Sequence, residues 1–355
     1  MIYLVGGARP NFMKIAAISR SFDHYGIVYE IIHTGQHYDY NMNQVFFDEF
    51  GLRSPKVHLE VGSGHHGVQT GKIMEKFEML CLDDRPRMVF VVGDVNSTMA
   101  AALVAAKLHI PIAHQEAGMR SFDKRMPEEI NRVVTDHVSD VLFPISQKDL
   151  ENLLDEGIDR DKIHLVGDPM IDNLLYYVDQ IPERDVKEKH ILVELHRPSN
   201  VDVVSNLTEI MLGLSKLAEK YHIVFPIHPR TRKMIYKYGL TRYLEGIDHC
   251  EPMGYFDFHE MMKYAGCVIT DSDGIQQETS VLNISCLAIR DTCNIQYTID
   301  FGTNELCDAD RDQIFNKAIM KFHTKETNKF TGTLEMLNNG FACDRIAEAL
   351  ISLDS

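Results

Sequence analysis

Carboxylates follow short apolar runs, or open a helical pattern, at three places in the first half of the chain. Asp94 comes soon after the run Met88–Val92, Glu116 follows the run 110–113, and Glu128 lies at a helix start. Clustered carboxylates suit proton transfer, because crowding and burial can raise one pKa towards neutrality. Taken singly, each acid can equally be a helix cap or a surface group.

Basic side chains stand at comparable places, and they matter because the formal net charge is -16. An acidic protein that binds a phosphate-bearing ligand needs a locally basic pocket. The candidates for that pocket are Arg9, Lys14, Arg197, Arg230 and Arg290. Surface ion pairing is the alternative interpretation of each.

The segment 271–278, DSDGIQQE, follows an apolar run and starts a helical pattern. Ser272 and Gly274 can offer hydroxyl and backbone N–H groups to a diphosphate at a helix N-terminus, and Glu278 can reach a ribose diol. The alternative is an ordinary N-cap with solvated acids. His196 and His228 each head a His-Arg or His-Pro-Arg element, but the chain holds 17 histidines and a single one means little.

Several kinds of protein are disfavoured by what the sequence lacks. It has no G-x-G-x-x-G turn directly after an expected strand, no H-x-x-x-H in an expected helix, no Cys/His pairing and no G-x-S-x-G elbow, so we expect no dinucleotide cofactor, no metal and no serine nucleophile. The acidic balance argues against nucleic acid and anionic membranes as partners. No signal peptide or membrane span is predicted, and seven scattered cysteines without C-x-x-C favour a reducing, cytoplasmic location.

Short apolar runs alternate with longer helical patterns along the whole chain. Continuously apolar strands between helices predict parallel sheets that are covered on both faces. The expected strands are 2–5, 28–32, Met88–Val92, 110–113, Val141–Phe143, 163–166, 191–194, Ile223–Pro226, 268–270 and Cys286–Ile289. The expected helices include 65–82, 96–107, 203–220, 256–265, 275–282 and 308–322.

The polar clusters follow the expected strands, so they should lie along the carboxyl edges of two parallel sheets, where open α/β sheets bind ligands. We therefore predict an α/β fold with two Rossmann-like domains that face each other across a cleft. The boundary is placed near residue 170, giving domains 1–170 and 171–339, with a final helix in 340–355 that packs back on the first domain.

Read in order, these elements resemble the non-hydrolysing UDP-N-acetylglucosamine 2-epimerase family. The resemblance runs from residue 3 to about residue 322 and is specific only when its parts are taken together. The segments that carry it are GARPNFMK (7–14), HTGQHYDYNM (33–42), VVGDVNSTMAA (91–101), HQEAGMRSFDKRMPEEINR (114–132), ELHRPSNVD (194–202), PIHPRTRK (226–233), EPMGYFDF (251–258), DSDGIQQE (271–278), RDT (290–292) and GTNEL (302–306).

The resemblance implies the two-Rossmann GT-B arrangement, a UDP-sugar substrate, no cofactor and a homodimer. The family's catalytic acids would fall on Asp94, Glu116 and Glu128, and its catalytic-site histidine on His196. Ser272 and Gly274 would hold the diphosphate, Glu278 the ribose, Phe258 would lie near the uracil, and Arg9 would reach the nucleotide from the other side. A second, activating nucleotide sugar would lie near Gln36 and His228.

The activity that the resemblance implies is inversion of C2 in a UDP-linked 2-acetamido sugar, by elimination of UDP and its re-addition. Two alternatives stay open at this point. One is a GT-B glycosyltransferase, which would share the cleft and the nucleotide site. The other is a catalytically impaired homologue that binds nucleotide sugars. Two departures from the family pattern favour it: Asp273 replaces a usual glycine and can repel a diphosphate, and Asn294-Ile295-Gln296 replaces a usual Glu-Arg-Pro element.

Overall fold

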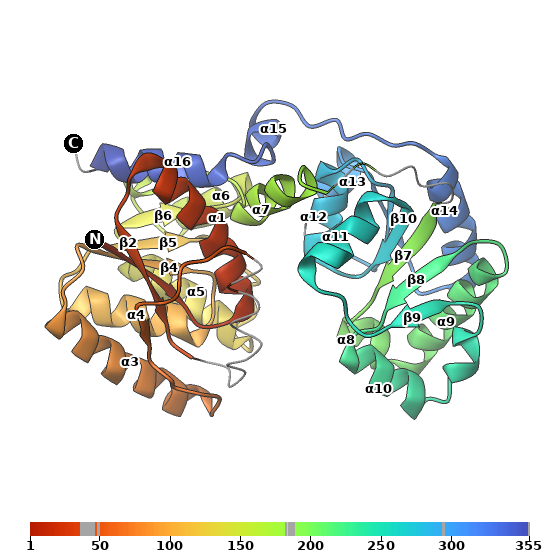
Figure 1. Cartoon of the computed structure of the whole chain (residues 1–355), viewed down its shortest axis with the longest axis horizontal. Helices are drawn as coiled ribbons and strands as arrows, with labels where there is room; N and C mark the ends of the chain where they lie inside the picture. The colour runs from red at the N-terminus through yellow and green to blue at the C-terminus, as the bar shows by residue number, and fades with distance from the viewer. Residues whose placement is uncertain (36–46, 48–49, 182, 184–188, 293–294, 354–355) are drawn as a thin grey trace. The chain divides into compact units, whose positions relative to one another are not determined.

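The computed structural model describes residues 1–35, 47, 50–181, 183, 189–292 and 295–353. The chain forms two compact units (Figure 1). Unit 1 is Met1–Leu175 together with the segment from Thr333 onward, and unit 2 is Tyr176–Gly332. Within the described ranges, we find no helix with the length and apolar character needed to cross a bilayer.

Each unit is built on one six-stranded sheet in which every paired neighbour is parallel. The order in unit 1 is β3-β2-β1-β4-β5-β6 and in unit 2 it is β12-β11-β10-β7-β8-β9. Numbered within its own unit, each sheet has the order 3-2-1-4-5-6, which is that of the Rossmann fold. The predicted α/β fold with two Rossmann-like halves is confirmed.

The strands of unit 1 are β1 (Ile2–Gly6), β2 (Tyr29–His33), β3 (Val57–His58), β4 (Met88–Val92), β5 (Ile112–Gln115) and β6 (Val141–Phe143). Those of unit 2 are β7 (His190–Glu194), β8 (Ile223–Pro226), β9 (Asp248–Cys250), β10 (Ala265–Thr270), β11 (Cys286–Ile289) and β12 (Asn304–Cys307).

The helices described for unit 1 are α1 (Arg9–Tyr25), α3 (His66–Asp83), α4 (Asn96–Lys107), α5 (Pro127–Val138), α6 (Gln147–Asp155), the 3-10 turn η1 (Arg160–Lys162), α15 (Thr333–Leu337) and α16 (Ala342–Leu353). Helix α7 (Pro169–Val178) runs from unit 1 into unit 2. Unit 2 has α8 (Pro198–Val201), α9 (Val204–Ala218), α10 (Pro229–Lys237), the 3-10 turn η2 (Thr241–Leu244), α11 (Tyr255–Lys263), α12 (Asp273–Val281), α13 (Tyr297–Asp300) and α14 (Arg311–His323).

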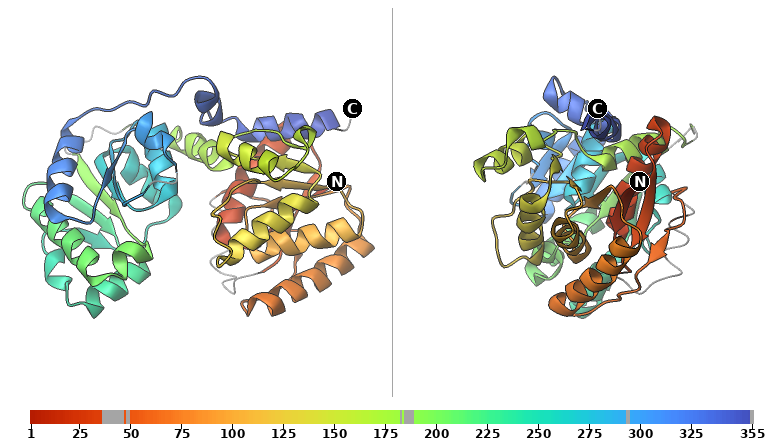
Figure 2. Two further views of the ribbon diagram at one scale, coloured as in Figure 1. Left: turned by 180° about the vertical axis from the view of Figure 1, so that it is seen from behind. Right: turned by 90° about the vertical axis from the view of Figure 1, so that its left-hand side faces the viewer.

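Helices cover both faces of the sheet in unit 1, as Figures 1 and 2 show. On one face, Phe77 of α3 and the alanines of α4 pack in one cluster with Val89 and Val91 of β4. On the other face, the ring of Phe22 from α1 meets Phe90 edge-on, with centroids 6.0 Å apart. Since alternate residues of β4 face opposite helix layers, the residues on both faces of the strand must be apolar. This accounts for the continuous apolar run.

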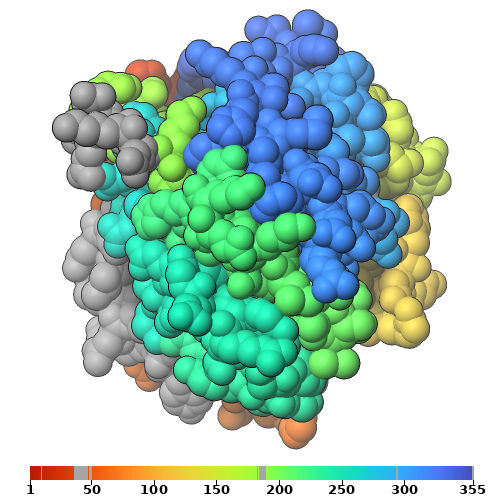
Figure 3. Space-filling model, turned by 90° about the vertical axis from the view of Figure 1, so that its right-hand side faces the viewer, coloured from red at the N-terminus to blue at the C-terminus, as the bar shows by residue number. Residues whose placement is uncertain are grey.

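The sheet of unit 2 is covered in the same way. Ile191 and Val193 of β7 pack with residues of α9 and α14, while Leu192 packs on the other side with Met262 of α11. Helix α14 lies beside α9 (Figure 3), and Lys216 and Asp312 pair across them at 3.1 Å.

The final helix expected in 340–355 is α16, and it lies against α1 (Figures 1 and 2). The hydroxyl of Ser21 donates to Asp344 Oδ1 at 2.7 Å, and that of Tyr25 donates to Glu348 Oε1 at 3.0 Å. The end of the chain therefore packs on the helix that follows its first strand.

The expected strand 163–166 is wrong, since only Ile163 makes a bridge, to Leu142 of β6. Three strands of the sheets were not expected, namely β3, β9 and β12. Each lies at the edge of its sheet, and the two shortest are largely polar and exposed, so neither apolar run nor alternation marks them.

Gly118, two residues beyond Glu116, is the glycine whose replacement should damage unit 1 most clearly. Its φ is +84°, and a Cβ placed there would lie 2.2 Å from the carbonyl oxygen of Asp149. We expect Gly118→Ala to lower the free energy of unfolding by about 3 kcal/mol or more, from backbone strain and overpacking together. Gly26 is the matched control, because its φ is +70° and nothing lies within 4 Å of a Cβ there. Gly26→Ala should cost only about 1 kcal/mol in urea unfolding, and equal losses in the two variants would contradict the packing explanation.

Candidate active site

The strand order reverses between β1 and β4 in unit 1, and between β7 and β10 in unit 2. Loops that leave the carboxyl ends of two such strands run in opposite directions and leave room for a ligand between them. Gly93 and Asp94 follow β4, and Asp271 and Ser272 follow β10. In each unit, one of the predicted polar clusters therefore lies at the point where the strand order reverses.

Asp94 is held by α5 through a charged side chain that the sequence analysis did not single out. Arg132 approaches Asp94 Oδ2 with Nη2 at 2.7 Å and with Nε at 3.0 Å. The neighbouring Asn131 donates to the carbonyl oxygen of Asp94 at 2.8 Å. The carboxylate is thus fixed in place while part of it stays exposed, as a base that meets a substrate must be.

Glu116 pairs with Lys14, which α1 brings to the same corner of unit 1. Burial would lower the pKa of Lys14, but the charges of Glu116, Asp168 and Asp94 outweigh it and raise that pKa. Lys14 is therefore a buried cation beside two of the three predicted acids. Gly93 leaves space for the pair, since a Cβ there would lie 3.3 Å from Glu116 Oε2.

Glu128 lies in the first turn of α5 and is half-buried. Its neighbour Glu129 accepts the backbone N–H groups of Ser121 and Phe122, at 2.8 and 2.9 Å. Among the described side chains, none forms a hydrogen bond or ion pair with Glu128. Because Glu128 and Arg132 are four residues apart on α5, they share a helix face. The structure therefore brings Glu128 to the side of the helix that holds Asp94.

Beneath these acids, a buried charge network fixes the backbone before Asp94. His114 places Nδ1 2.6 Å from Asp136 Oδ1 and Nε2 2.9 Å from the carbonyl oxygen of Gly93. Both partners are acceptors, so the arrangement requires a proton on each ring nitrogen. Burial would raise the pKa of Asp136, but His114 and Arg120 lower it. A histidine and two further charges thus hold the turn after β4 in one conformation.

Two more carboxyls are buried near Glu116. Burial is the main cause that raises the pKa of Asp168 to about 6, with a contribution from the charge of Glu116. The pKa of Asp149 is also raised to about 6, mainly by burial and further by the charge of Glu116. The site of unit 1 therefore contains acids that change charge near pH 6.

In unit 2, Asp271 ties the end of β10 to the end of β7. Its Oδ1 accepts the backbone N–H of His196 at 3.0 Å, and its Oδ2 accepts that of Arg197 at 3.1 Å. Asn200 donates to the same Oδ2 at 3.0 Å. Since Asp271 is fully buried, these bonds replace the water that the carboxylate loses on folding.

Asp273 forms ion pairs with both Arg197 and Arg290. The helix start that follows Ser272 is otherwise open. The Ser272 side chain makes no capping bond, and a Cβ on Gly274 would have only the Ser272 hydroxyl near it, at 3.8 Å. The turn at residues 272–274 therefore has free space at Gly274 and a carboxylate that pairs with two of the predicted arginines.

Glu278, one turn along α12, is buried and lies 3.2 Å from His259 of α11. Burial would lower the pKa of His259, but the charge of Glu278 raises it. Phe258, next to His259, is half-buried and packs on the cluster formed with Leu192 and Met262. The residues predicted for the ribose and the uracil thus come from adjoining helices of one unit.

His228 caps α10, with its Nδ1 accepting the backbone N–H of Arg230 at 3.2 Å. Its ring centroid lies 5.6 Å from that of His196. Arg230 itself turns to Asp202 and donates to both of its oxygens, at 3.0 and 2.6 Å. The structure therefore places His228 beside His196 and leaves Arg230 in an exposed ion pair.

Comparison with known proteins identifies the family of the chain. The sequence model described as UDP-N-acetylglucosamine 2-epimerase matches residues 21–351. A UDP-N-acetylglucosamine 2-epimerase of Methanocaldococcus jannaschii is 38% identical over 98% of both chains. A UDP-2,3-diacetamido-2,3-dideoxy-D-glucuronate 2-epimerase of Pseudomonas aeruginosa is 38% identical over 99% of both. The M. jannaschii crystal structure in complex with UDP-GlcNAc and UDP is 37% identical, covers 99% of both chains and has a TM-score of 0.81.

The chain belongs to the UDP-N-acetylglucosamine 2-epimerase family. The family suspected from the motifs is thereby confirmed.

Two residues expected in an epimerase site are not covered. Gln36 lies outside the described residues, and of Arg9 only the backbone at the start of α1 is described. The structure also adds Arg132 and Glu194, which the sequence analysis did not single out. Arg132 has a signal in the sequence, since it lies four residues after Glu128 in an expected helix. Glu194 has none, because it reads as the last residue of an apolar strand.

The buried carboxyl of Asp168 should make the stability of this epimerase-family chain depend on pH. Its pKa rises on folding from an ordinary 3.8 to about 6. Between those values the folded chain keeps a proton that the unfolded chain has lost, so stability falls as pH rises from about 4 to about 6. A change of one in pKa corresponds to about 1.4 kcal/mol, and Asp168 thus contributes roughly 3 kcal/mol to this fall.

We expect Asp168→Asn to reduce that fall when unfolding by urea is measured from pH 4 to 7. The amide oxygen can still accept the N–H of Met170, which Asp168 Oδ1 now binds at 2.9 Å. Asp155→Asn, at an exposed position of α6, is the control and should keep the wild-type slope. A wild-type slope in Asp168→Asn as well would mean that Asp168 is ionised throughout.

Proposed function

We propose that the chain is an epimerase that inverts C2 of a UDP-linked 2-acetamido sugar by eliminating UDP and adding it back. The observation that carries this proposal is the group of Asp94, Glu116 and Glu128 at the reversal point of unit 1. Lys14 and Arg132 lie against two of these acids. Its relatives include epimerases of UDP-N-acetylglucosamine and of a UDP-diacetamido sugar.

The chemistry explains why several carboxylates are needed. No carbonyl group lies next to C2, so its proton is too weakly acidic for direct removal. If the C1–O bond breaks first, UDP leaves with the electron pair and the oxocarbenium-like ring makes the C2 proton labile. A carboxylate then takes that proton and a glycal forms. Return of a proton to the opposite face, and of UDP to C1, gives the inverted sugar. One base is therefore required on each face.

Unit 2 supplies the groups that suit the nucleotide. Ser272 and Gly274 at the start of α12 hold the diphosphate, Glu278 the ribose, and Phe258 lies by the uracil. Arg197, Arg290 and the histidine His196 stabilise the charge that develops on the departing diphosphate. No redox cofactor takes part, because each step moves only protons and the UDP group.

The sugar is of the 2-acetamido class, either UDP-GlcNAc and UDP-ManNAc or a deoxy-aminohexose analogue. Asp273 favours one second candidate, a homologue that binds nucleotide sugars and is impaired in catalysis. A glycosyltransferase needs one acceptor-side base, and three acids around one sugar exceed that need. We further propose a cytoplasmic homodimer, as the resemblance implies, with activation by a second nucleotide sugar near Gln36 and His228.

Incubation with UDP-GlcNAc and its 6-deoxy analogues in deuterated water separates these functions. An epimerase gives deuterium at C2 together with an inverted product, measured by NMR and mass spectrometry. Release of free UDP without return of the sugar would mean hydrolysis. Binding without exchange for every sugar tested would support the impaired homologue.

Replacement of Asp94 should separate binding from chemistry. Asp94→Asn keeps a side chain of the same shape beside Arg132, but the amide cannot take a proton. We expect UDP affinity to stay within about twofold and C2 exchange to fall by roughly 100-fold or more, measured by deuterium uptake. Asp83→Asn, exposed at the end of α3, is the control. Wild-type exchange in Asp94→Asn would remove Asp94 from the catalytic set.

Replacement of Asp273 tests whether its carboxylate opposes the diphosphate. Asp273→Asn frees Arg197 and Arg290 from their ion pairs, so both charges become available to an anion. We expect UDP to bind about five- to tenfold more tightly in calorimetry, a gain of roughly 1 kcal/mol for groups that are partly exposed. Asp257→Asn, in the first turn of α11 and exposed, should leave the affinity unchanged. Weaker binding in Asp273→Asn would show that Asp273 orients the arginines instead.

A further inference from the structure

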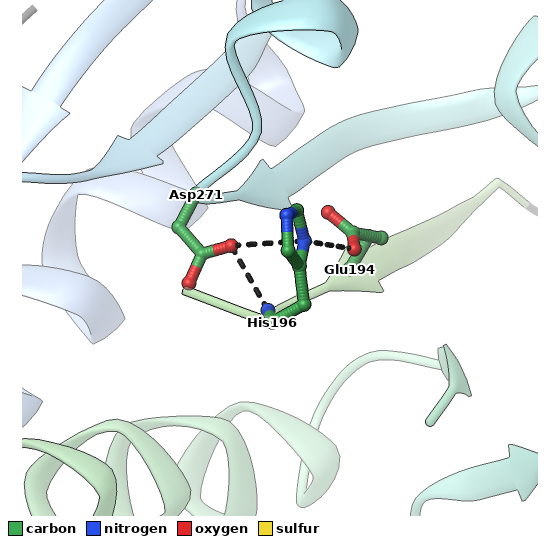
Figure 4. A group of neighbouring side chains, drawn as sticks. All are labelled: Glu194, His196 and Asp271. Atoms are coloured by element: carbon green, nitrogen blue, oxygen red, sulfur yellow. Dashed lines mark hydrogen bonds and ion pairs between the residues drawn. The ribbon is translucent and has the colours of Figure 1, made fainter. Parts of the chain in front are cut away.

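Glu194, the last residue of β7, forms a compact group with His196 and Asp271 (Figure 4). Its Oε1 lies 2.7 Å from Nδ1 of His196. The same ring nitrogen is 3.5 Å from Oδ1 of Asp271. The role proposed above for His196 does not explain why β7 ends with the carboxylate of Glu194.

Both carboxylate oxygens of Glu194 accept hydrogen bonds, as a largely buried carboxylate requires. Oε2 accepts the hydroxyl of Thr270 at 3.0 Å, and that hydroxyl accepts the backbone N–H of Ser272, also at 3.0 Å. Glu194 is therefore joined on one side to His196 and on the other to the residue that precedes α12. A chain of hydrogen bonds connects the histidine to Ser272, at the turn that opens α12.

This contact determines which proton His196 keeps. A carboxylate accepts only, so Nδ1 must carry the proton that is shared with Glu194. Within the described part of the chain, Nε2 has no hydrogen-bond partner, and it is the nitrogen left for a ligand. A second carboxylate, Asp271, holds the backbone of the same residue, so the ring has little freedom to turn.

Four ionisable groups face the ring of His196. Glu194 and Asp271 favour its charged form, while Arg197 opposes it. The fourth is His228, whose own pKa is lowered by burial and by His196. The hydrogen bond to Glu194 is the largest influence, and the pKa of His196 is raised although burial acts against it.

We propose that Glu194 is a positioning residue that holds His196 with a proton on Nδ1 and presents Nε2–H to the bound diphosphate. This inference rests on the proposed function. When the C1–O bond breaks, negative charge grows on the β-phosphate oxygens, and the Nε2–H of an imidazolium donates a charge-assisted hydrogen bond to them. No proton has to leave His196, and the bond weakens again when UDP returns to C1.

A metal ion is the competing explanation, since the three side chains offer ligand atoms within 4.8 Å of one another. The hydrogen bonds argue against it. Asp271 already accepts three N–H groups, and Glu194 accepts the Thr270 hydroxyl and the His196 ring. A cation would have to displace donors that hold the ends of β7 and β10 together.

The test follows the ¹⁵N resonances of His196 against pH in the full chain without substrate, with His196→Gln used to assign them. Glu194→Gln keeps an acceptor for Nδ1–H but loses the charge. We expect the pKa of His196 to fall and the tautomer with the proton on Nε2 to gain population. Asp248→Asn is the matched control, because Asp248 lies 3.5 Å from His222 in an exposed pair of the same unit. It should leave His196 unchanged.

Epimerisation kinetics provide the second readout. In Glu194→Gln, we expect kcat to fall by about tenfold or more with KM little changed. The alkaline limb of the kcat profile should move to lower pH, since the imidazolium is lost earlier. Glu194→Asp keeps the charge but withdraws the carboxylate, so it should lower kcat with a smaller movement of that limb. It also serves if Glu194→Gln does not fold.

The outcomes are separable. An unchanged pKa and tautomer of His196 in both variants would overturn the proposal even if the enzyme epimerises. The expected NMR changes without any epimerisation would support the placement of His196 and reject the proposed function. Tight binding of Zn²⁺ to the wild type, lost in Glu194→Gln and needed for activity, would replace the positioning role by a metal site.

Discussion

Acids can remain charged inside unit 1 only because cations are packed against them. Lys14 pairs with Glu116, and Arg132 pairs with Asp94, at the point where the strand order of the sheet reverses. A carboxylate that leaves water without a partner loses far more free energy than one hydrogen bond returns. The pairs therefore explain how one small region can hold several carboxylates, while Glu128, which has no ion pair with any described side chain, stays half-exposed.

The cations come from helices, and this makes the site depend on the packing of the fold. Lys14 is on α1, which α16 covers, and Arg132 is on α5. Below them, His114 joins the turn after β4 to Asp136 of α5. Unit 2 repeats the principle at its own reversal point, where Asp271 joins the ends of β7 and β10. In both units a buried charge fixes the backbone on which an exposed functional group stands.

Most of the strands and helices could be predicted because burial on both faces gives the strands of a parallel sheet an unbroken apolar sequence. Edge strands such as β9 lack that burial, so their sequence carries no comparable signal. Asp94 and Glu116 were singled out because they follow expected strands, and Glu128 because it lies at the start of an expected helix. Arg132 lies inside a helix. Its pairing with Asp94 depends on α5 lying beside the end of β4, and no local sequence pattern predicts that packing. Glu194 was missed for a related reason, since its partner Thr270 is 76 residues away in the chain.

Asp273 shows how one departure from a family pattern is accommodated. A carboxylate at the start of α12 is favoured by the helix dipole, and Arg197 and Arg290 neutralise it further. The substitution does not by itself exclude an anion, because space remains beside Gly274. The net positive charge that a diphosphate would meet is nevertheless smaller than two arginines would give. The affinity of this turn for an anion would therefore depend on how strongly Asp273 holds the two arginines.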